Sequence, residues 1–277
     1  MLAQSAYGKS RVRLVQVCRR GDRHDLRDLT VAIQFKGHYD EAYTDGDNSG
    51  VLPTDTMKNT VYALAAQQPI VAPERLGLSL AERFLDRNPR LTRARIDLTE
   101  HLWKRLSEAG RTSGHAFLRR GPEMRTAAVA RSRRKTLVGA GIADLLILKS
   151  ADSAFDDFIR DEYTTLPETR DRILATSLTA TWQYSEVDLD FTAAWHAVRQ
   201  TLLDVFAGHK SESVQHTLYA MGQAVLDSVP DVRAIHLVMP NKHHIPFDLS
   251  RVGLENRNEI FVPTDEPHGL IEATLVR

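Results

Sequence analysis

The chain has 277 residues, of which 42% are hydrophobic and 26% are charged, and its 36 lysines and arginines balance 36 acidic residues. This composition is typical of a globular protein with one or two cores, and it argues against nucleic acid or a membrane as a partner. The lone cysteine, Cys18, excludes an intrachain disulfide and a cysteine-rich zinc site, and it favours a reducing compartment such as the cytoplasm.

The first half of the chain predicts two strands, two helices and two further strands. A valine-rich run at 11–20 is followed by a run of period 2 at 28–37, and the two are consistent with an antiparallel pair. The period then changes at "TDTMKNTVYALAAQQ" (54–68), where Met57, Val61, Leu64 and Ala65 fall on one helical face. A second helix is predicted at 78–88. Two strands complete this half, at 91–103 and at 114–132, the latter with a break at "GPEM".

The second half of the chain repeats this order of elements. Strands are predicted at 135–150, with a glycine turn, and at 177–187, and helices follow at 191–209 and 213–229. The last two strands are predicted at 232–240 and 269–277. Each copy has the usual size of a domain, so we expect two domains, 1–136 and 137–277.

This order of elements predicts an α+β protein of two tandem antiparallel ββααββ domains, with the helices on the outer face of each sheet. The repetition lies in the order of elements and not in the residues themselves. The opposite face of the sheet is rich in arginine, and it is either solvated or lines a tunnel in an oligomer.

Lys9, Thr54 and Asp55 are the first candidates for chemistry. Lys9 belongs to "YGK" (7–9), and a lysine near the start of a chain is usually a solvated charge. Thr54 and Asp55 stand where a helix is predicted to begin, and both residue types are favoured there as caps or in the first turn. The same position also suits an anion, because free N–H groups and the positive end of the helix dipole attract negative charge.

Two further stretches offer planar groups. In "FDDFIRDEYTTLPETRDR" (155–172), Phe155 presents a flat apolar face and Arg172 a planar fork of donors for a carboxylate-like or heterocyclic anion. The alternative is that Phe155 belongs to the core and Arg172 pairs with a nearby acid. Val214 and Gln215 open the helix predicted at 213–229, where the glutamine either hydrogen-bonds a purine edge or simply caps the helix.

The string "PNKHH" (240–244) suggests a metal site, an acid/base group or an inert polar loop. A metal site normally needs three or four convergent ligands, and adjacent histidines on an extended chain point to opposite faces. The sequence contains no HxH, HExxH or CxxC pattern. We therefore expect no metal here, and a single inward histidine acting as a proton shuttle is the better interpretation.

Taken together and in this order, "YGK", "TDTMKNTVY", "FDDFIRDEYTTLPETRDRIL", "SVQ" and "PNKHH" resemble the urate oxidase (uricase) family. The resemblance extends from Tyr7 to about Ile271. It implies the tunnelling fold (T-fold), with two tandem antiparallel-sheet domains per chain and a homotetramer built around a tunnel. It also implies an oxidoreductase of purine breakdown, which converts urate, O2 and water into 5-hydroxyisourate and H2O2 without a metal or organic cofactor.

The resemblance also implies how the substrate is held. Phe155 would stack on the urate ring, and Arg172 and Gln215 would grip one edge of it with planar pairs of hydrogen bonds. The backbone N–H of Val214 would add a donor. Asp55, mainly through its backbone, would hold the opposite side of the ring.

The same resemblance implies a proton relay of Lys9, Thr54 and His243, and it places O2, and then water, on Asn241 and Thr54. In the family these groups come from two subunits, with Lys9, Thr54 and Asp55 on one subunit and the remaining site residues on its neighbour. The site would therefore exist only in an oligomer. Urate and O2 are the expected partners, with no nucleic acid and no membrane.

Two other functions stay open. One is another tunnelling-fold enzyme that acts on pterins or purine nucleotides, although such enzymes commonly need zinc held by His or Cys clusters, which this sequence lacks. The other is a non-catalytic purine-binding homologue. The N-terminus lacks the apolar region of a signal peptide, and "ATLVR" is not a peroxisomal tail, so we expect a bacterial-type cytoplasmic enzyme. No role is predicted for His244.

Overall fold

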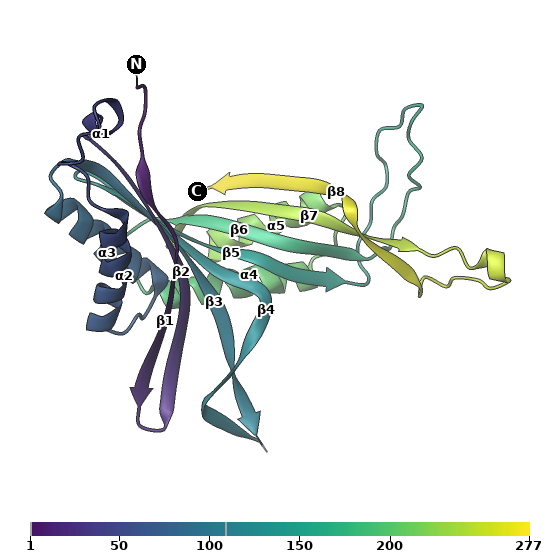
Figure 1. Cartoon of the computed structure of the whole chain (residues 1–277). Coiled ribbons are helices and arrows are strands. Elements are labelled where there is room, and N and C mark those ends of the chain that lie inside the picture. The colour runs from purple at the N-terminus through teal and green to yellow at the C-terminus, as the bar shows by residue number, and fades with distance from the viewer. Residues whose placement is uncertain (1, 109) are drawn as a thin grey trace. The chain divides into compact units, whose positions relative to one another are not determined.

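The computed structural model of the chain describes residues 2–108 and 110–277 (Figure 1). The described residues divide into two compact units. Unit 1 extends as far as Gly141 and also takes in Gln183–Trp195, whereas unit 2 consists of Ile142–Trp182 and His196–Arg277. The predicted domain boundary between residues 136 and 137 stays a prediction.

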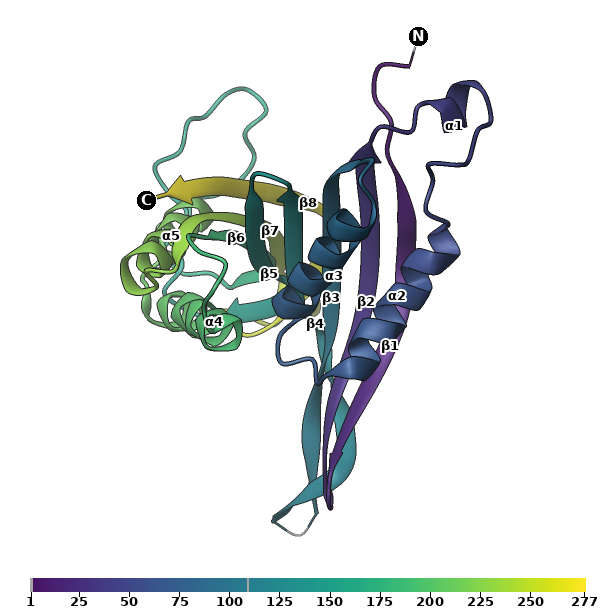
Figure 2. The same cartoon turned by 90° about the vertical axis from the view of Figure 1, so that its left-hand side faces the viewer.

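Unit 1 is an antiparallel sheet with helices on one face. Its strands are hydrogen-bonded to one another in chain order: β1 (Tyr7–Arg20), β2 (Arg23–Gly37), β3 (Leu91–Glu108) and β4 (Arg111–Ser132). The connection from β2 to β3 carries three helices: α1 (Glu41–Thr44), α2 (Thr54–Gln67) and α3 (Pro73–Arg87). Helix α2 packs against β1, and α3 packs against β3 and β4, so both cover the same face of the sheet (Figure 2).

The core of unit 1 follows from the two periodicities in its sequence. Every second residue in the middle of β2 is buried: Leu29, Val31, Ile33 and Phe35. The predicted face of α2 is also buried at Met57, Val61 and Ala65, with Leu64 half-buried at its rim. Fully burying an aliphatic side chain stabilises a fold by about 1.5–3 kcal/mol, so these stripes fix which face of each element turns inward.

Unit 2 contains a second set of strands and helices in the same order. It holds most of β5 (Thr136–Lys149) and β6 (Leu174–Tyr184) and all of β7 (Val232–Pro246) and β8 (Phe261–Val276), hydrogen-bonded in this order. Between β6 and β7 the chain forms α4 (Phe191–Gly208) and α5 (Val214–Ser228), and α5 packs against β7 and β8. A short 3-10 turn, η1 (Ser250–Val252), precedes β8. The predicted α+β class with antiparallel strands is confirmed, and among the described residues the short α1 is the one α-helix that the predicted order ββααββ did not include. No helix among the described residues is long and apolar enough to cross a membrane.

Two predicted interruptions of strands are wrong. Strand β4 runs through "GPEM" without a break, because Gly121 adopts a positive φ of 43° and the pairing with β3 shifts register between His101 and Trp103. Strand β5 likewise continues through Gly139 and Gly141, where a glycine turn was predicted. In both strands the glycine adapts to the ladder of backbone hydrogen bonds instead of ending it.

Strands β1, β7 and β8 extend into polar sequence that shows no apolar alternation. Strand β1 begins at Tyr7 instead of residue 11, β7 ends at Pro246 instead of residue 240, and β8 begins at Phe261 instead of residue 269. Pairing with the neighbouring strand holds these extensions, so buried side chains are not needed there. As a result, the predicted relay residues Lys9 and His243 lie on paired strands and not in loops.

Candidate active site

The predicted site residues form two groups that lie in different units. Unit 1 carries Lys9, Thr54 and Asp55. Unit 2 carries the other six: Phe155, Arg172, Val214, Gln215, Asn241 and His243. Within unit 2, backbone hydrogen bonds gather the first four of these, whereas the last two stand on β7. Among the described residues of unit 2, no hydrogen bond joins the four residues of the first set to the two residues on β7.

Thr54 and Asp55 occupy the first turn of α2, directly after Pro53. Pro53 is the N-cap residue (φ −56°, ψ 138°), and no side chain caps the helix from that position. Thr54 is therefore not the cap, and Thr54 and Asp55 are first-turn residues, a position that also suits both residue types without any chemistry. Helix geometry leaves the first backbone N–H groups without an intrahelical acceptor, and they form the positive end of the helix dipole. This helix start is suited to an anion.

The Asp55 carboxylate is occupied within its own helix. Lys58 Nζ lies 2.5 Å from its Oδ1, and Asn59 Nδ2 lies 2.9 Å from its Oδ2. These two hydrogen bonds contribute most to lowering the pKa of Asp55, and the charge of Lys9 lowers it further. The charge of Lys9 therefore acts on the start of α2, although less strongly than that of Lys58. The backbone of Asp55, and not its carboxylate, stays available for a ligand.

Tyr7 anchors the start of β1 beside this helix. Its hydroxyl accepts a hydrogen bond from the backbone N–H of Leu52 (3.0 Å), and its ring packs edge-on against Tyr39 with 4.8 Å between the centroids. Tyr7 lies two residues before Lys9, and Leu52 lies two residues before Thr54. The bond therefore sets the position of the relay lysine relative to the helix start. Sequence reasoning gave Tyr7 no role, although the aromatic residue in "YGK" was the available signal.

Gly8 allows β1 to approach β2 closely next to Lys9. A Cβ atom on Gly8 would lie 1.8 Å from the backbone oxygen of Ile33, so a larger residue does not fit without moving the strand. Just beyond, the pairing shifts register between Lys9 and Val12, and Arg11 adopts a positive φ of 56°. This bulge separates Lys9 from the part of β1 in which buried and exposed residues alternate, which begins at Val12.

Phe155 and Arg172 are brought side by side by backbone hydrogen bonds. The N–H of Phe155 donates to the carbonyl of Thr169 (2.7 Å), and the N–H of Arg172 donates to the carbonyl of Ser153 (2.8 Å). The Cζ atom of Arg172 lies 5.2 Å from the centroid of the Phe155 ring, within the range of a cation–π contact. Both side chains are half-buried, so Phe155 is not a fully buried residue of the hydrophobic core.

One buried nitrogen of the Arg172 guanidinium has no hydrogen-bond acceptor in the described part of the chain. Its Nε atom is buried without a hydrogen-bond partner. Burial lowers the pKa of Arg172, and no carboxylate among the described residues forms an ion pair that would oppose this effect. A buried donor without an acceptor is costly, so an anion in front of the guanidinium would relieve that cost. The alternative in which Arg172 pairs with a nearby acid is wrong.

Backbone hydrogen bonds also tie this pair to the start of α5. The N–H of Ser211 donates to the carbonyl of Asp152 (2.9 Å), and the N–H of Ala154 donates to the carbonyl of Ser211 (2.7 Å). Ala154 directly precedes Phe155, and Ser211 lies three residues before α5. The ring, the guanidinium and the helix start are therefore held in one region of unit 2.

Ser213 caps α5, with its Oγ accepting a hydrogen bond from the N–H of His216 (3.1 Å). The alternative that Gln215 is only a cap is therefore wrong. Val214 is buried and Gln215 is exposed in the first turn. The glutamine amide is thus free to meet a ligand, and the first N–H groups of α5 point to the same end of the helix.

Asn241 and His243 are half-buried on β7, where the pairing with β8 shifts register between them. Strict alternation of side chains is not kept at this shift. A hollow of about 460 Å³ is bordered by three successive residues: Lys242, His243 and His244. The prediction that Lys242 and His244 lie on the face opposite His243 stays a prediction.

Lys242 behaves as an ordinary surface charge. Its Nζ lies 2.6 Å from Oδ1 of Asp265, and this hydrogen bond lowers the pKa of the carboxyl group. Among residues 2–108 and 110–277, no three His, Cys, Asp or Glu side chains gather so that they could hold a metal ion.

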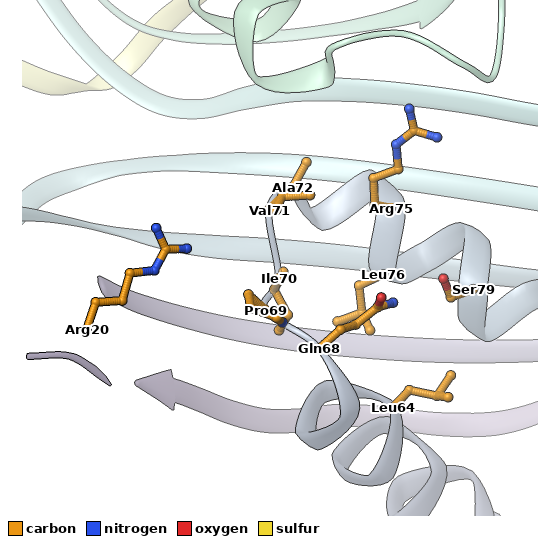
Figure 3. A pocket seen from close by; sticks show the side chains of 10 residues that line it. All are labelled: Arg20, Leu64, Gln68, Pro69, Ile70, Val71, Ala72, Arg75, Leu76 and Ser79. Atoms are coloured by element: carbon orange, nitrogen blue, oxygen red, sulfur yellow. The ribbon is translucent and has the colours of Figure 1, made fainter. Parts of the chain in front are cut away.

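A separate hollow of about 390 Å³ lies in unit 1, between the end of α2 and the start of α3 (Figure 3). Apolar side chains such as Leu64 and Leu76 form part of its lining, together with two arginines. One of them, Arg75, is already bound to Asp188 (2.7 Å). None of the predicted site residues lines this hollow, so it is not part of the candidate active site.

Known proteins are similar to this chain over its whole length. A protein-family model described as Uricase matches residues 5–130 and 138–272. The uricase of Arthrobacter globiformis is 43% identical over 277 residues, which cover 100% of this chain and 90% of that protein. The uricase of Danio rerio is 37% identical over 280 residues, which cover 99% of this chain and 94% of that protein.

Solved structures show the same likeness. The crystal structure of uricase from Arthrobacter globiformis gives a TM-score of 0.96 at 43% identity, covering 100% of this chain and 95% of that chain. A urate oxidase from Bacillus sp. TB-90 gives a TM-score of 0.88 at 22% identity, covering 99% of this chain and 100% of that chain. At that identity the second likeness shows the fold alone.

Proposed function

This chain belongs to the uricase family, and on that premise we propose that it is a urate oxidase, which converts urate, O2 and water into 5-hydroxyisourate and H2O2 without a metal or organic cofactor. It has the tunnelling fold of that family. The observation that carries the proposal is the Arg172 guanidinium, which lies against the Phe155 ring and keeps a buried donor unused by the described residues.

Urate fits this pair of groups because it is a flat purine anion at neutral pH. Its ring would stack on Phe155, and one edge would accept hydrogen bonds from the planar fork of Arg172. Gln215, exposed in the first turn of α5, would bind the same edge. The N–H of Val214 would add a donor at the positive end of the helix, which favours an anionic ligand.

A neighbouring subunit would complete the site in a homotetramer. Lys9, Thr54 and Asp55 of one subunit would meet the urate that another subunit holds. The backbone of Asp55 would bind the side of the ring opposite Arg172, since its carboxylate is already occupied within α2. This arrangement accounts for finding two groups of site residues, each well held by its own contacts.

The proposed reaction moves two electrons from urate to O2. Loss of a second proton makes urate electron-rich enough to reduce O2 directly, and water then adds to the oxidised ring while the reduced oxygen leaves as H2O2. Lys9, Thr54 and His243 would relay the protons. Asn241, with Thr54, would hold O2 and then water above the ring. The protein supplies position, charge stabilisation and proton transfer.

Turnover of urate by the purified tetramer is expected to survive a metal chelator. The loss of urate absorbance, the uptake of O2 and the release of H2O2 are measured together, and we expect equal amounts of each. A folded tetramer that consumes no urate would refute the oxidase function. Activity that a chelator abolishes and that zinc or copper restores would instead refute the cofactor-free mechanism.

Replacing either Lys9 or Thr54 is expected to slow the chemical step. Lys9→Met and Thr54→Ala should each lower kcat by roughly 10- to 10³-fold, the scale of help from general acid–base catalysis. Urate binding should change less, because Phe155 and Arg172 remain. Steady-state kinetics over a range of urate concentrations separates the two effects.

Two matched variants act as controls for this result. Lys36→Met removes an exposed lysine from β2, and Thr56→Ala removes an exposed threonine from the same turn of α2. Both should keep kcat near the wild-type value. If either control lowered kcat as much as Lys9→Met or Thr54→Ala does, the losses at Lys9 and Thr54 would reflect a change of the fold and not of proton transfer.

A further inference from the structure

Three basic side chains gather behind the start of α5: Lys149, His209 and His216. Lys149 is the last residue of β5, His209 directly follows α4, and His216 lies in the first turn of α5. None of them has a role in the proposed reaction. They surround the turn that precedes Val214 and Gln215, so they bear on how urate is held.

Lys149 connects β5 to this turn. Its Nζ donates a hydrogen bond to the backbone carbonyl of His209, whose own N–H donates to the carbonyl of Val205 in the last turn of α4 (2.9 Å). The His209 ring packs edge-on against His216, with 4.4 Å between the centroids and 72° between the planes. The turn is thus held to β5 on one side and to α5 on the other.

The same turn carries the backbone bonds that reach the Phe155 loop. Ser211 pairs with Asp152 and with Ala154 at 2.9 and 2.7 Å. Lys149 lies only three residues before Asp152. The segment that leads to Phe155 is therefore joined to the turn at two places, once through the lysine side chain and once through the backbone.

The bond from Lys149 is suited to a positioning task. The side chain is half-buried, and burial lowers the pKa of its ammonium group while the charge of Asp152 opposes that shift. A hydrogen bond from a charged donor is shorter and stronger than one between neutral groups. Holding a carbonyl in this way fixes the backbone before the helix, and with it the direction of the first N–H groups of α5.

We propose that Lys149 is a positioning residue for urate binding, which keeps the first turn of α5 in register with Phe155 and Arg172. The inference deepens the proposed function and rests on it. Lys149 is not among the residues proposed to contact urate or to relay protons, and the bond to the His209 carbonyl is the route by which it would act. Its loss should alter the binding of urate more than the rate of the chemical step.

Lys149→Met in the full-length tetramer tests this inference. We expect KM for urate to rise by roughly 10- to 100-fold, the range in which small misplacements of binding groups reduce catalysis. The kcat at saturating urate should fall much less. Lys149→Arg, which can still donate to the His209 carbonyl, should restore most of the affinity.

Lys210→Met is the matched control. Lys210 is the residue after His209, its side chain is exposed, and it lies 3.5 Å from Glu212. The substitution removes the same charge from the same turn but leaves the bond to the carbonyl intact. An equal rise in KM for Lys210→Met, or a fall in kcat with unchanged KM for Lys149→Met, would overturn the positioning role.

Hydrogen exchange of the urate-free protein separates this inference from the proposed function. The amides of Ser211 and His216, both hydrogen-bonded, should exchange roughly tenfold faster in Lys149→Met, the change expected for losing a bond to a charged group. Unchanged exchange would refute the positioning role even in an active enzyme. If the amides exchange faster in Lys149→Met but the wild-type protein does not consume urate, only the proposed function is refuted. If Lys149→Met does not assemble, Lys149→Gln, with a shorter neutral donor, is measured by the same two criteria.

Discussion

Arg172→Ala is expected to weaken urate binding more than any other substitution in the site. The guanidinium is half-buried against Phe155, and its buried Nε has no acceptor from the described part of the chain. Truncating one partner of a buried, hydrogen-bonded charge pair costs roughly 2–5 kcal/mol. At about 1.4 kcal/mol per factor of ten, this corresponds to about 30- to 4,000-fold in kcat/KM.

Two variants show whether the planar fork or only the charge matters. Arg172→Lys keeps a positive charge but cannot form two parallel hydrogen bonds, so we expect it to recover little of the lost affinity. Arg170→Ala removes an arginine two residues away, whose side chain is 91% exposed beside Asp156. It should leave kcat/KM nearly unchanged. Equal losses from Arg170→Ala and Arg172→Ala would show a general charge effect and no specific clamp.

The helices and apolar strands are predictable from sequence because their periodicity is local. Met57 and Val61, four residues apart, fall on one face of α2 in any helix that contains them. The same reasoning predicts the buried stripe of α4, where Phe191, Val198 and Leu202 are all buried in the structure. In these elements a side chain's own neighbours along the chain decide which way it points.

The ends of the strands are not predictable in this way, because they depend on a distant partner. Lys9 lies on β1 because that segment pairs with residues around Ile33, and His243 lies on β7 because it pairs with Thr264. Neither segment has apolar alternation. The contact between Tyr7 and Leu52, which positions Lys9, also joins residues that are far apart along the chain. The residue types of the site were predicted, whereas the contacts that orient them were not.

Burial of a charged residue is equally hidden in the sequence. Arg125 and Arg131 both stand on β4, and each pairs with a glutamate of α3. Packing distinguishes them, since the Arg125 side chain is 3% exposed and that of Arg131 is 30% exposed. Two ion pairs that look alike in the sequence therefore have very different energetic roles, and only their burial in the structure distinguishes them.

Arg125→Met is expected to destabilise the folded protein by about 3–5 kcal/mol, the range for breaking a buried ion pair. Arg125 Nη2 lies 2.7 Å from Oε2 of Glu74, a residue with no exposed surface. The same nitrogen donates to the carbonyl of Phe191 (3.2 Å), and the guanidinium lies 5.3 Å from the ring centroid of Trp195. Removing it leaves a buried carboxylate without its partner.

Arg131→Met is the control for this prediction, because it breaks a partly exposed pair between the same two elements. We expect a loss of about 0–1 kcal/mol for it. Adding Glu74→Met to Arg125→Met should recover part of the loss, since no buried charge then remains. Unfolding by denaturant is compared at one fixed protein concentration, because the stability of an oligomer depends on concentration.

The pH dependence distinguishes the lost charge partner from lost packing. Burial raises the pKa of Glu74 above its ordinary value of 4.5, and the charge of Arg125 opposes that rise. A group with a raised folded-state pKa contributes stability below its unfolded pKa, and this contribution is lost as the pH rises through the folded pKa. Without Arg125 the folded pKa of Glu74 rises further. The penalty of Arg125→Met should therefore grow as the pH rises above 4.5 and Glu74 loses its proton, and it should shrink as the pH falls toward 4.5. A penalty that stays constant over this range would mean that Arg125 stabilises the unit by its packing against Trp195 and not by its charge.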